Sequence, residues 1–442
     1  MRKQVSYIYV LLFIALLVTG CRKDKLSTTE NPPEIIAMSP LSGPKGTIVT
    51  LTGINFSNDI TVVGVYVNGK YADVIESNLT TIKFIVPPRA GTGLILVSVN
   101  GNAGTGPFFE FIYTINVSTL TGFSAQPGLI DGNPQTARFH APAGIAIDQY
   151  DNLYIADELN HCIRKVTPSG NVSTFAGTGI AGHQDGTSNA ARFNAPSDIT
   201  FDKYNGNFYV ADKGNHCIRK INFAGDVFTV AGLPGTAGYV DAPGLSARLQ
   251  SPSGVAVEGE QPNLYIADQG NHCIRKLDDV GVMTTFAGSS SPGSQNGVGG
   301  AAKFSSPADI TWDSTGFLYV TDITNHNIRR ISKTTKEVFT AGGTGVPGYQ
   351  DGSPSASSFN SPAGIISENN QSIICDVMNS SIRLILYNDE VSTLAGDGNA
   401  GFLNGSGAAS KFNQPAGIVK DKNGDYFITE KGNNAVRKMT IY

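Results

Sequence analysis

The chain has 442 residues, of which 40% are apolar, and it carries 51 glycines, 22 prolines and a formal net charge of −4 at pH 7. This length allows two or three domains, and the apolar content with frequent turn residues is typical of a globular, turn-rich, mainly β protein. The slight acidic excess argues against nucleic acid as a partner, because binding to a phosphate backbone normally needs clustered Lys and Arg.

The first residues predict an export signal. Arg2 and Lys3 precede an apolar run at 7–18, which is shorter than a comfortable membrane span. The run ends in LVTGC, where small side chains stand directly before Cys21, and this resembles the lipobox of bacterial lipoproteins. The resemblance implies that residues 1–21 are a lipoprotein signal peptide and that Cys21 carries palmitate-type acyl chains.

The polar residues 22–31 predict a flexible tether between the lipid and the folded part. Several buried acyl chains, at about 0.8 kcal/mol per methylene, give stable membrane anchoring. We therefore expect a cell-envelope lipoprotein of the outer membrane. The KD pair that follows Arg22 resembles the surface-export signals of some lipoproteins, so a surface-exposed position is open beside an inward-facing one.

Residues 32–115 predict a separate β-sandwich. Short stretches of alternating apolar and polar residues are interrupted by Gly, Pro and Asn, as expected for about seven half-buried strands with tight turns. The opening MSPLSGPKGTIVTLTGINFS and the ending GTGLILVSVNG followed by PFFEFIY resemble the IPT/TIG family of immunoglobulin-like domains. The resemblance implies a non-catalytic spacer or a module that faces proteins or carbohydrates.

The remainder of the chain is built from a repeat of about 55 residues. One unit, residues 140–177, contains the segments GIAID, NLYIAD, CIRKV and VSTFA, which predict four short strands separated by turns. Four strands per unit indicate the blade of a β-propeller. The repeat is marked by one apolar residue before each inner strand: Phe139, Phe193, Leu249, Phe304, Phe359 and Phe412.

The sixth unit lacks its fourth strand, whereas VSTLTG at 117–122 matches the segments that end other units. We therefore predict a six-bladed propeller over residues 116–442, closed by this N-terminal strand, which removes the open sheet edge. The pattern PxGIxxDxxxNLYIADxxNHxIRK in most units resembles NHL repeats.

The residues that recur in every blade are predicted to be structural. A side chain that recurs in every blade is unlike a residue of a single asymmetric catalytic centre. In the last two blades Ser380 and Asn434, small hydrogen-bonding residues suited to a turn, replace the histidine. The alternative, a ring of working acids and bases, remains open. The set comprises His161, His216, His272 and His326, Asp157, Asp212, Asp268 and Asp322, and Arg164, Arg219, Arg275 and Arg329.

An enzymatic function is the weaker hypothesis. In the peptide-amidating lyases that resemble this architecture, zinc-binding histidines follow the Pro that begins each inner strand, but Ala or Ser stands there in this chain. No metal or other cofactor is expected. Calcium at Asp198 and Asp309, near the mouth of the central channel, is the alternative. The four cysteines after Cys21 are expected to be buried free thiols, because equivalent repeat positions lie too far apart for a disulfide.

Recognition is predicted to fall to residues that differ between blades. The long loops before each inner strand carry an unlike residue after a shared Gly, and aromatic side chains there suit stacking against sugars or anchoring of a peptide. Packing of one loop on the next is the alternative. The ligand candidates in these loops are His183, Tyr239, Tyr349 and Phe402, beside Leu129 and Ser294 at the same position.

We therefore expect a non-catalytic envelope lipoprotein whose loop face binds a glycan or a protein, with the IPT/TIG domain as spacer. The alternatives are a metal-assisted lyase or lactonase-type enzyme and a docking platform for envelope assemblies. Trp312, the single tryptophan, occupies an inner-strand position that Ile147, Phe201 and Val257 fill elsewhere, and it is predicted to belong to the core.

Overall fold

The computed structural model describes residues 31–122, 126–260, 262–386 and 388–442. The predictions about the signal peptide, Cys21 and nearly all of the tether fall on residues 1–30 and lie outside this part. The chain divides into two compact units, Met1–Tyr113 and Thr114–Tyr442. The regular secondary structure of the described residues consists of strands and short 3-10 turns. None of these residues forms a helix with the length and hydropathy of a membrane span.

The first unit is a β-sandwich. Its strands pair in the order β1-β3-β6-β5-β4-β7-β8-β2, and β1 also packs against β8, so that the sheet folds around one core. The bounds are β1 (Glu34–Ser39), β2 (Ser42–Gly43), β3 (Ile48–Ile54), η1 (Ile60–Val62), β4 (Val63–Val67), β5 (Lys70–Ser77), β6 (Thr81–Ile85), β7 (Gly93–Val99) and β8 (Asn102–Phe111).

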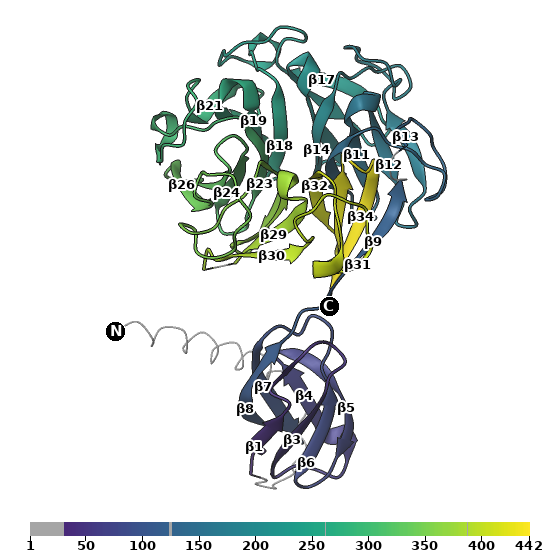
Figure 1. The fold of residues 1–442 in the computed structure, drawn as a ribbon, viewed down its shortest axis with the longest axis vertical. Coiled ribbons are helices and arrows are strands. Elements are labelled where there is room, and N and C mark those ends of the chain that lie inside the picture. The colour runs from purple at the N-terminus through teal and green to yellow at the C-terminus, as the bar shows by residue number, and fades with distance from the viewer. Residues whose placement is uncertain (1–30, 123–125, 261, 387) are drawn as a thin grey trace. The chain divides into compact units, whose positions relative to one another are not determined.

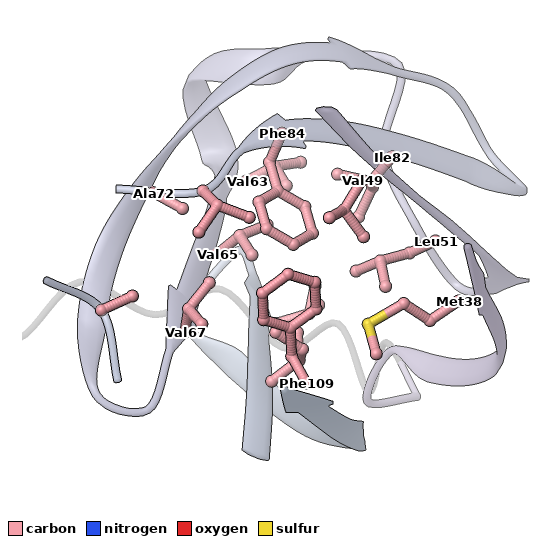
Figure 2. Close-up of a cluster of buried hydrophobic side chains, with 14 of the residues drawn as sticks. Met38, Val49, Leu51, Val63, Val65, Val67, Ala72, Ile82, Phe84 and Phe109 are labelled. Atoms are coloured by element: carbon pink, nitrogen blue, oxygen red, sulfur yellow. The ribbon is translucent and has the colours of Figure 1, made fainter. Parts of the chain in front are cut away.

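Alternation of side chains explains how these strands fill the core. In β3, Val49 and Leu51 point inward while Thr50 between them does not, as the two-residue period of a strand requires. Figure 2 shows both side chains gathered with Phe84 and Phe109 in the centre of the sandwich, and all four are fully buried.

The second unit is a ring of six sheets, or blades, as predicted (Figure 1). Neighbouring inner strands contact one another in order, and the first contacts the last. The strands of blades 1 to 3 are β10 (Pro142–Ile147), β11 (Leu153–Asp157), β12 (Cys162–Val166), β13 (Val172–Ala176); β14 (Pro196–Asp202), β15 (Asn207–Asp212), β16 (Cys217–Ile221), β17 (Val227–Ala231); β18 (Pro252–Glu258), β19 (Asn263–Asp268), β20 (Cys273–Leu277) and β21 (Met283–Gly288).

Blades 4 to 6 repeat the arrangement, with two additional two-residue strands. Their strands are β23 (Pro307–Trp312), β24 (Phe317–Asp322), β25 (Asn327–Ser332), β26 (Glu337–Gly342) and β22 (Gly297–Val298); β27 (Pro362–Glu368), β28 (Gln371–Asp376), β29 (Ser381–Ile385), β30 (Val391–Ala395); β32 (Pro415–Lys420), β33 (Tyr426–Glu430), β34 (Ala435–Ile441), β9 (Ile115–Gly122) and β31 (Gly405–Ser406). The 3-10 turns are η2 (Glu158–Asn160), η3 (Lys213–Asn215), η4 (Gly244–Ser246), η5 (Gln269–Asn271), η6 (Gly299–Ala301), η7 (Val377–Asn379) and η8 (Gly407–Ala409).

Strand β9 closes the ring. It pairs antiparallel with β34 from Gly122 opposite Ala435 to Ile115 opposite Ile441, and the blue strand lies beside the yellow one in Figure 1. The predicted closure of the last blade by an N-terminal strand is therefore confirmed. Pairing the two ends of the propeller removes an edge that could otherwise recruit another chain.

The apolar core lies between neighbouring blades. Tyr154 and Ala156 of blade 1, for example, pack in one cluster with Phe193 and Phe208 of blade 2. The apolar residue that marks each repeat is fully buried in all six blades: Phe139, Phe193, Leu249, Phe304, Phe359 and Phe412. The repeat period is therefore set by a core position.

The propeller has two distinguishable ends. In blade 2, Pro196 at the start of β14 lies opposite Asp212 at the end of β15, and Asp202 lies opposite Asn207 at the other end of the same hairpin. We call the end with Pro196 and Asp212 the loop end, because the long loops bind there through contacts such as Asn215 Nδ2 to the Gly182 carbonyl at 2.8 Å. The end with Asp202 and Asn207 is the hairpin end.

Candidate functional site

A buried arginine joins three segments of each blade at the loop end. In blade 1, Nη1 of Arg164 donates to Asp157 Oδ2 at 3.0 Å and to the Arg138 carbonyl at 2.8 Å. Its Nη2 donates to Asp131 Oδ1 of the long loop at 2.6 Å. Asn160 Nδ2 completes the cluster by donating to Asp157 Oδ2 at 2.7 Å. The guanidinium thus ties the second strand, the third strand and the loop together.

The same cluster recurs around the ring. The six arginines are fully buried, and the other five contact their carboxylates at 2.7–3.2 Å. Burial raises the pKa of Asp212, Asp268 and Asp322 to about 6, although the arginine counteracts part of the rise. The remaining pairs are Arg219 with Asp212, Arg275 with Asp268, Arg329 with Asp322, Arg383 with Asp376 and Arg437 with Glu430.

Each repeated histidine binds the next blade through Nδ1. His161 accepts the backbone N–H of Ala195 at 3.0 Å, and His216 accepts that of Ser251 at 3.0 Å. His272 and His326 make the same contact with Ser306 and Ser361. The sixth blade uses Asn434 Oδ1, which accepts the Ala141 N–H at 2.8 Å.

These acceptors stabilise a strained backbone. The donating N–H groups belong to residues in the left-handed region, with φ of 49° at Ala195 and 50° at Ser251, where non-glycine residues are uncommon. Because Nδ1 accepts a hydrogen bond, the imidazoles are neutral, and burial lowers the pKa of His161, His216 and His326. The Asn-His pairs therefore have structural contacts that account for them.

The two channel carboxylates also bind backbone groups. Asp198 Oδ2 accepts the Val255 N–H of blade 3 at 2.8 Å, and Asp309 Oδ2 accepts the Ile365 N–H of blade 5 at 2.9 Å. Burial, reinforced by the charge of Asp309, raises the pKa of Asp198, and burial raises that of Asp309 to about 6. Calcium prefers six to eight oxygen ligands, so these two carboxylates alone do not make such a site.

Other potential metal ligands do not converge in the described part of the chain, where no group of three or more His, Cys, Asp or Glu side chains could hold an ion. The cysteines Cys162, Cys217, Cys273 and Cys375 are buried free thiols. Burial raises the pKa of each thiol, as expected for small packing residues.

The four loop candidates lie over the arginine clusters. The rings of Tyr239, Tyr349 and Phe402 lie 5.0, 5.1 and 4.8 Å from the guanidinium carbons of Arg275, Arg383 and Arg437. Tyr239 Oη also shares a hydrogen bond with Thr285 Oγ1 of β21, the outer strand of blade 3, at 2.9 Å.

His183 makes the matching polar contact in blade 2, with Nε2 2.8 Å from Thr229 Oγ1. The three aromatic residues nevertheless remain 38–43% exposed. Each side chain therefore packs on its own blade with one part and faces solvent with the rest.

The entrance of the central channel contains residues that the sequence reasoning missed. The residue after each second-strand carboxylate varies around the ring, with Lys in two blades. Four of the six line a recess of about 100 Å³. Glu158 forms an ion pair with Lys431 at 2.5 Å, and burial lowers the pKa of Lys213. The six residues are Glu158, Lys213, Gln269, Ile323, Val377 and Lys431.

The hairpin end contains a larger cleft of about 570 Å³ between blades 2, 3 and 4. It was also missed, because the sequence reasoning placed ligands only at the loop end. Phe201, Tyr204 and Trp312 line it. Trp312 is only partly buried and packs at the margin of its core cluster, so the prediction that it is a core residue was wrong in part.

Two family models match the chain. Residues 33–111 match the IPT/TIG domain, and residues 193–221 match the NHL repeat. The fold and these matches define the protein as an IPT/TIG domain followed by a six-bladed propeller of NHL-type repeats.

Relatives among curated proteins match up to 60% of this chain. The chain is 32% identical over 285 residues to Protein SUPPRESSOR OF QUENCHING 1, chloroplastic, from Arabidopsis thaliana, in an alignment that covers 60% of this chain and 27% of the relative. The chain spans well under half the length of the curated relatives that head this comparison.

Solved structures resemble nearly the whole chain. A protein of unknown function from Bacteroides thetaiotaomicron has a TM-score of 0.66 at 20% identity and covers 94% of this chain and 99% of its own. An auxiliary nutrient binding protein from the same organism has a TM-score of 0.58 at 19% identity and covers 93% of this chain and 98% of its own. At these identities the likeness establishes the fold.

Proposed function

We propose that the protein is a non-catalytic binding protein of the cell envelope, which docks a protein partner on the loop end of its propeller. The observation that carries the proposal is the set of apolar side chains on the long loops. Tyr239, Tyr349 and Phe402 keep 38–43% of their surface exposed, and aromatic residues of this kind anchor protein interfaces.

Neighbouring positions extend the apolar surface. Ile130, Val240 and Leu403, each directly after one of the unlike loop residues, are also exposed. The adjacent exposed apolar residues on each of these loops are therefore candidates for an interaction site. A glycan is the alternative occupant, since tyrosine rings also stack on sugars. The repeated Asp and Arg side chains pair with each other, and each repeated His binds a backbone N–H of the next blade. Recognition is therefore left to the residues that vary.

The proposed location in the cell envelope supports a binding function. The LVTGC segment resembles a lipobox, so the proposed protein is anchored through Cys21 in the outer membrane, with residues 22–31 as a tether and the IPT/TIG domain as spacer. The auxiliary nutrient binding protein of similar fold supports a binding role for this protein. We therefore propose that the protein acts in an uptake or docking assembly of the envelope.

Site-specific photo-crosslinking in cells tests the proposal. A crosslinking amino acid at position 349 should capture one envelope protein, and the same residue at position 204 on the hairpin end should not. The purified partner should then bind a Tyr239→Ala/Tyr349→Ala/Phe402→Ala variant about 30-fold more weakly, because interface anchors are worth about 2 kcal/mol or more. Equal affinity of the folded variant, or a saturable glycan ligand on the loop end, would argue against a protein partner.

A further inference from the structure

The cleft at the hairpin end arises from unequal side chains at one register position. Phe201 of blade 2 and Trp312 of blade 4 are large, whereas Val257 between them is small and is followed by Glu258 and Gly259. Two aromatic residues therefore flank a low floor, and the resulting cleft of about 570 Å³ lies within the usual range for small-molecule sites, about 300–1,000 Å³. The six equivalent residues around the ring are Ile147, Phe201, Val257, Trp312, Ser367 and Lys420.

Trp312 is not explained by packing alone. Its indole Nε1 is buried and has no hydrogen-bond partner in the structure, and an unpaired buried donor costs about 1–3 kcal/mol. Phenylalanine fills the same position in blade 2 without that penalty, where Phe201 packs on Phe208 with ring centroids 4.9 Å apart. The larger ring of Trp312 contacts Tyr265 edge-on at 4.8 Å and adds apolar wall to the cleft.

The charges of the cleft are largely compensated. Glu258 forms an ion pair with Lys333, whose Nζ lies 5.6 Å from the centre of the Trp312 ring. Asp202 and Asp313 accept backbone N–H groups of their own hairpin turns, from Tyr204 at 3.0 Å and from Thr315 at 2.7 Å. Lys203 lies over the Tyr204 ring at 5.1 Å. With three carboxylates and two ammonium groups in the lining, the cleft does not favour an anionic ligand.

We propose that this cleft binds a neutral saccharide, with an apolar face of a sugar ring against the Trp312 and Phe201 walls. A pyranose presents C–H groups on its faces and hydroxyl groups at its edge, which matches aromatic walls beside polar residues. Thr200, Thr311 and Ser314 also line the cleft and supply hydroxyl partners for the sugar edge. The site lies at the opposite end of the inner strands from the proposed partner surface, so either can exist without the other.

Intrinsic fluorescence reports on the cleft directly, because Trp312 is the only tryptophan of the chain. The full-length protein is titrated with neutral oligosaccharides, namely linear α-glucan, β-glucan, mannan and galactan fragments, and with an oligouronate. At least one neutral sugar should produce a saturable change in emission, and the oligouronate should bind more weakly. Calorimetry should then show about tenfold or greater weakening for Trp312→Phe and for Phe201→Leu, or about 1.4 kcal/mol or more.

The matched control is Tyr349→Ala on the loop end, which should bind the sugar as the unchanged protein does. Circular dichroism and thermal melting verify that every variant is folded. If Trp312→Phe does not fold, Phe201→Leu alone still tests the proposal. The proposal is overturned if none of the neutral sugars alters emission at millimolar concentration, if the oligouronate binds best, or if both cleft variants retain full affinity. If Tyr349→Ala abolished sugar binding, the sugar site would instead be assigned to the loop end.

Discussion

A fully buried guanidinium in every blade binds groups that are far apart in the chain, and this gives a direct prediction for Arg219. Replacing Arg219 with Met leaves Asp212, now contacted at 2.7 Å, buried without a counter-charge. The free energy of unfolding should fall by about 3–5 kcal/mol. Because burial already raises the pKa of Asp212 to about 6, the loss should be larger at higher pH, where the carboxylate is ionised.

Denaturant unfolding of Arg219→Met at two pH values measures this loss. Adding Asp212→Asn should restore part of the stability, since the amide carries no charge. Lys220→Met, a neighbouring change at a side chain with no ion pair in the described structure, should stay within about 0.5 kcal/mol. A small, pH-independent effect of Arg219→Met would show that the cluster contributes little.

The repeated histidines predict a component of stability that is lost in mild acid. Burial lowers the pKa of His161, His216 and His326 in the folded state below the unfolded value of about 6.5. As pH falls through about 6.5, the unfolded chain takes up protons first, so the contribution of these residues declines until the folded pKa is passed. The buried carboxylates with raised pKa act in the opposite direction over the same window.

The variant His216→Asn separates the two effects, because Asn434 makes the same contact in blade 6. At about pH 8 the variant should be close to the unchanged protein, whereas His216→Ala should cost about 1–2 kcal/mol through the lost acceptor. Between about pH 7 and pH 5 the unchanged protein should lose stability relative to His216→Asn. A constant difference in stability between the two proteins across that range would show that the hydrogen bond to His216 Nδ1 does not depend on a neutral imidazole.

At the scale of elements, β9 is predicted to decide whether the propeller is stable. A fragment that begins at residue 114 retains β9 and should unfold cooperatively. A fragment that begins at residue 126 leaves β34 with an open edge along the pairing now made with β9, and it should melt lower and self-associate. Calorimetry and sedimentation of both fragments measure this. Equal melting temperatures and monomeric behaviour would mean that the ring does not depend on this strand.

The elements themselves could be predicted because each blade repeats the same local signals. In blade 1 the four expected segments correspond to β10–β13, since alternating apolar residues and turn residues specify strands locally. The left-handed residues Ala195, Ser251, Ser306 and Ser361 could not be predicted. An imidazole of the preceding blade stabilises their conformation, and no local pattern reveals this contact.

For the whole molecule, sequence reasoning found the loop-end candidates but not the cleft. Tyr239, Tyr349 and Phe402 occupy a position whose residue type varies among the blades, and an alignment of the blades therefore reveals them. The cleft depends on the different sizes of Phe201, Val257 and Trp312 in three neighbouring blades. Each of these residues, taken alone, is an ordinary apolar residue of a strand. The alignment of repeats could have revealed the contrast if the residue sizes at this position had been compared around the ring.

The proposed location in the cell envelope predicts that Cys21 is essential for membrane attachment. Cys21→Ser should abolish incorporation of labelled palmitate and release the protein from the membrane fraction, because buried acyl chains supply the anchoring energy. Ser27→Ala in the tether is the matched control and should leave both unchanged. A membrane-bound Cys21→Ser protein would mean that something other than the acyl chains holds it.

The central claim is that residues shared by the blades build the ring and that unlike residues carry recognition. It is tested most directly by comparing the crosslinked partner's affinity for two folded variants, His161→Asn/His216→Asn/His272→Asn/His326→Asn and Tyr239→Ala/Tyr349→Ala/Phe402→Ala. The account predicts that the histidine variant binds as the unchanged protein does and that the loop variant loses binding. Retained binding by the loop variant together with loss in the histidine variant would contradict it.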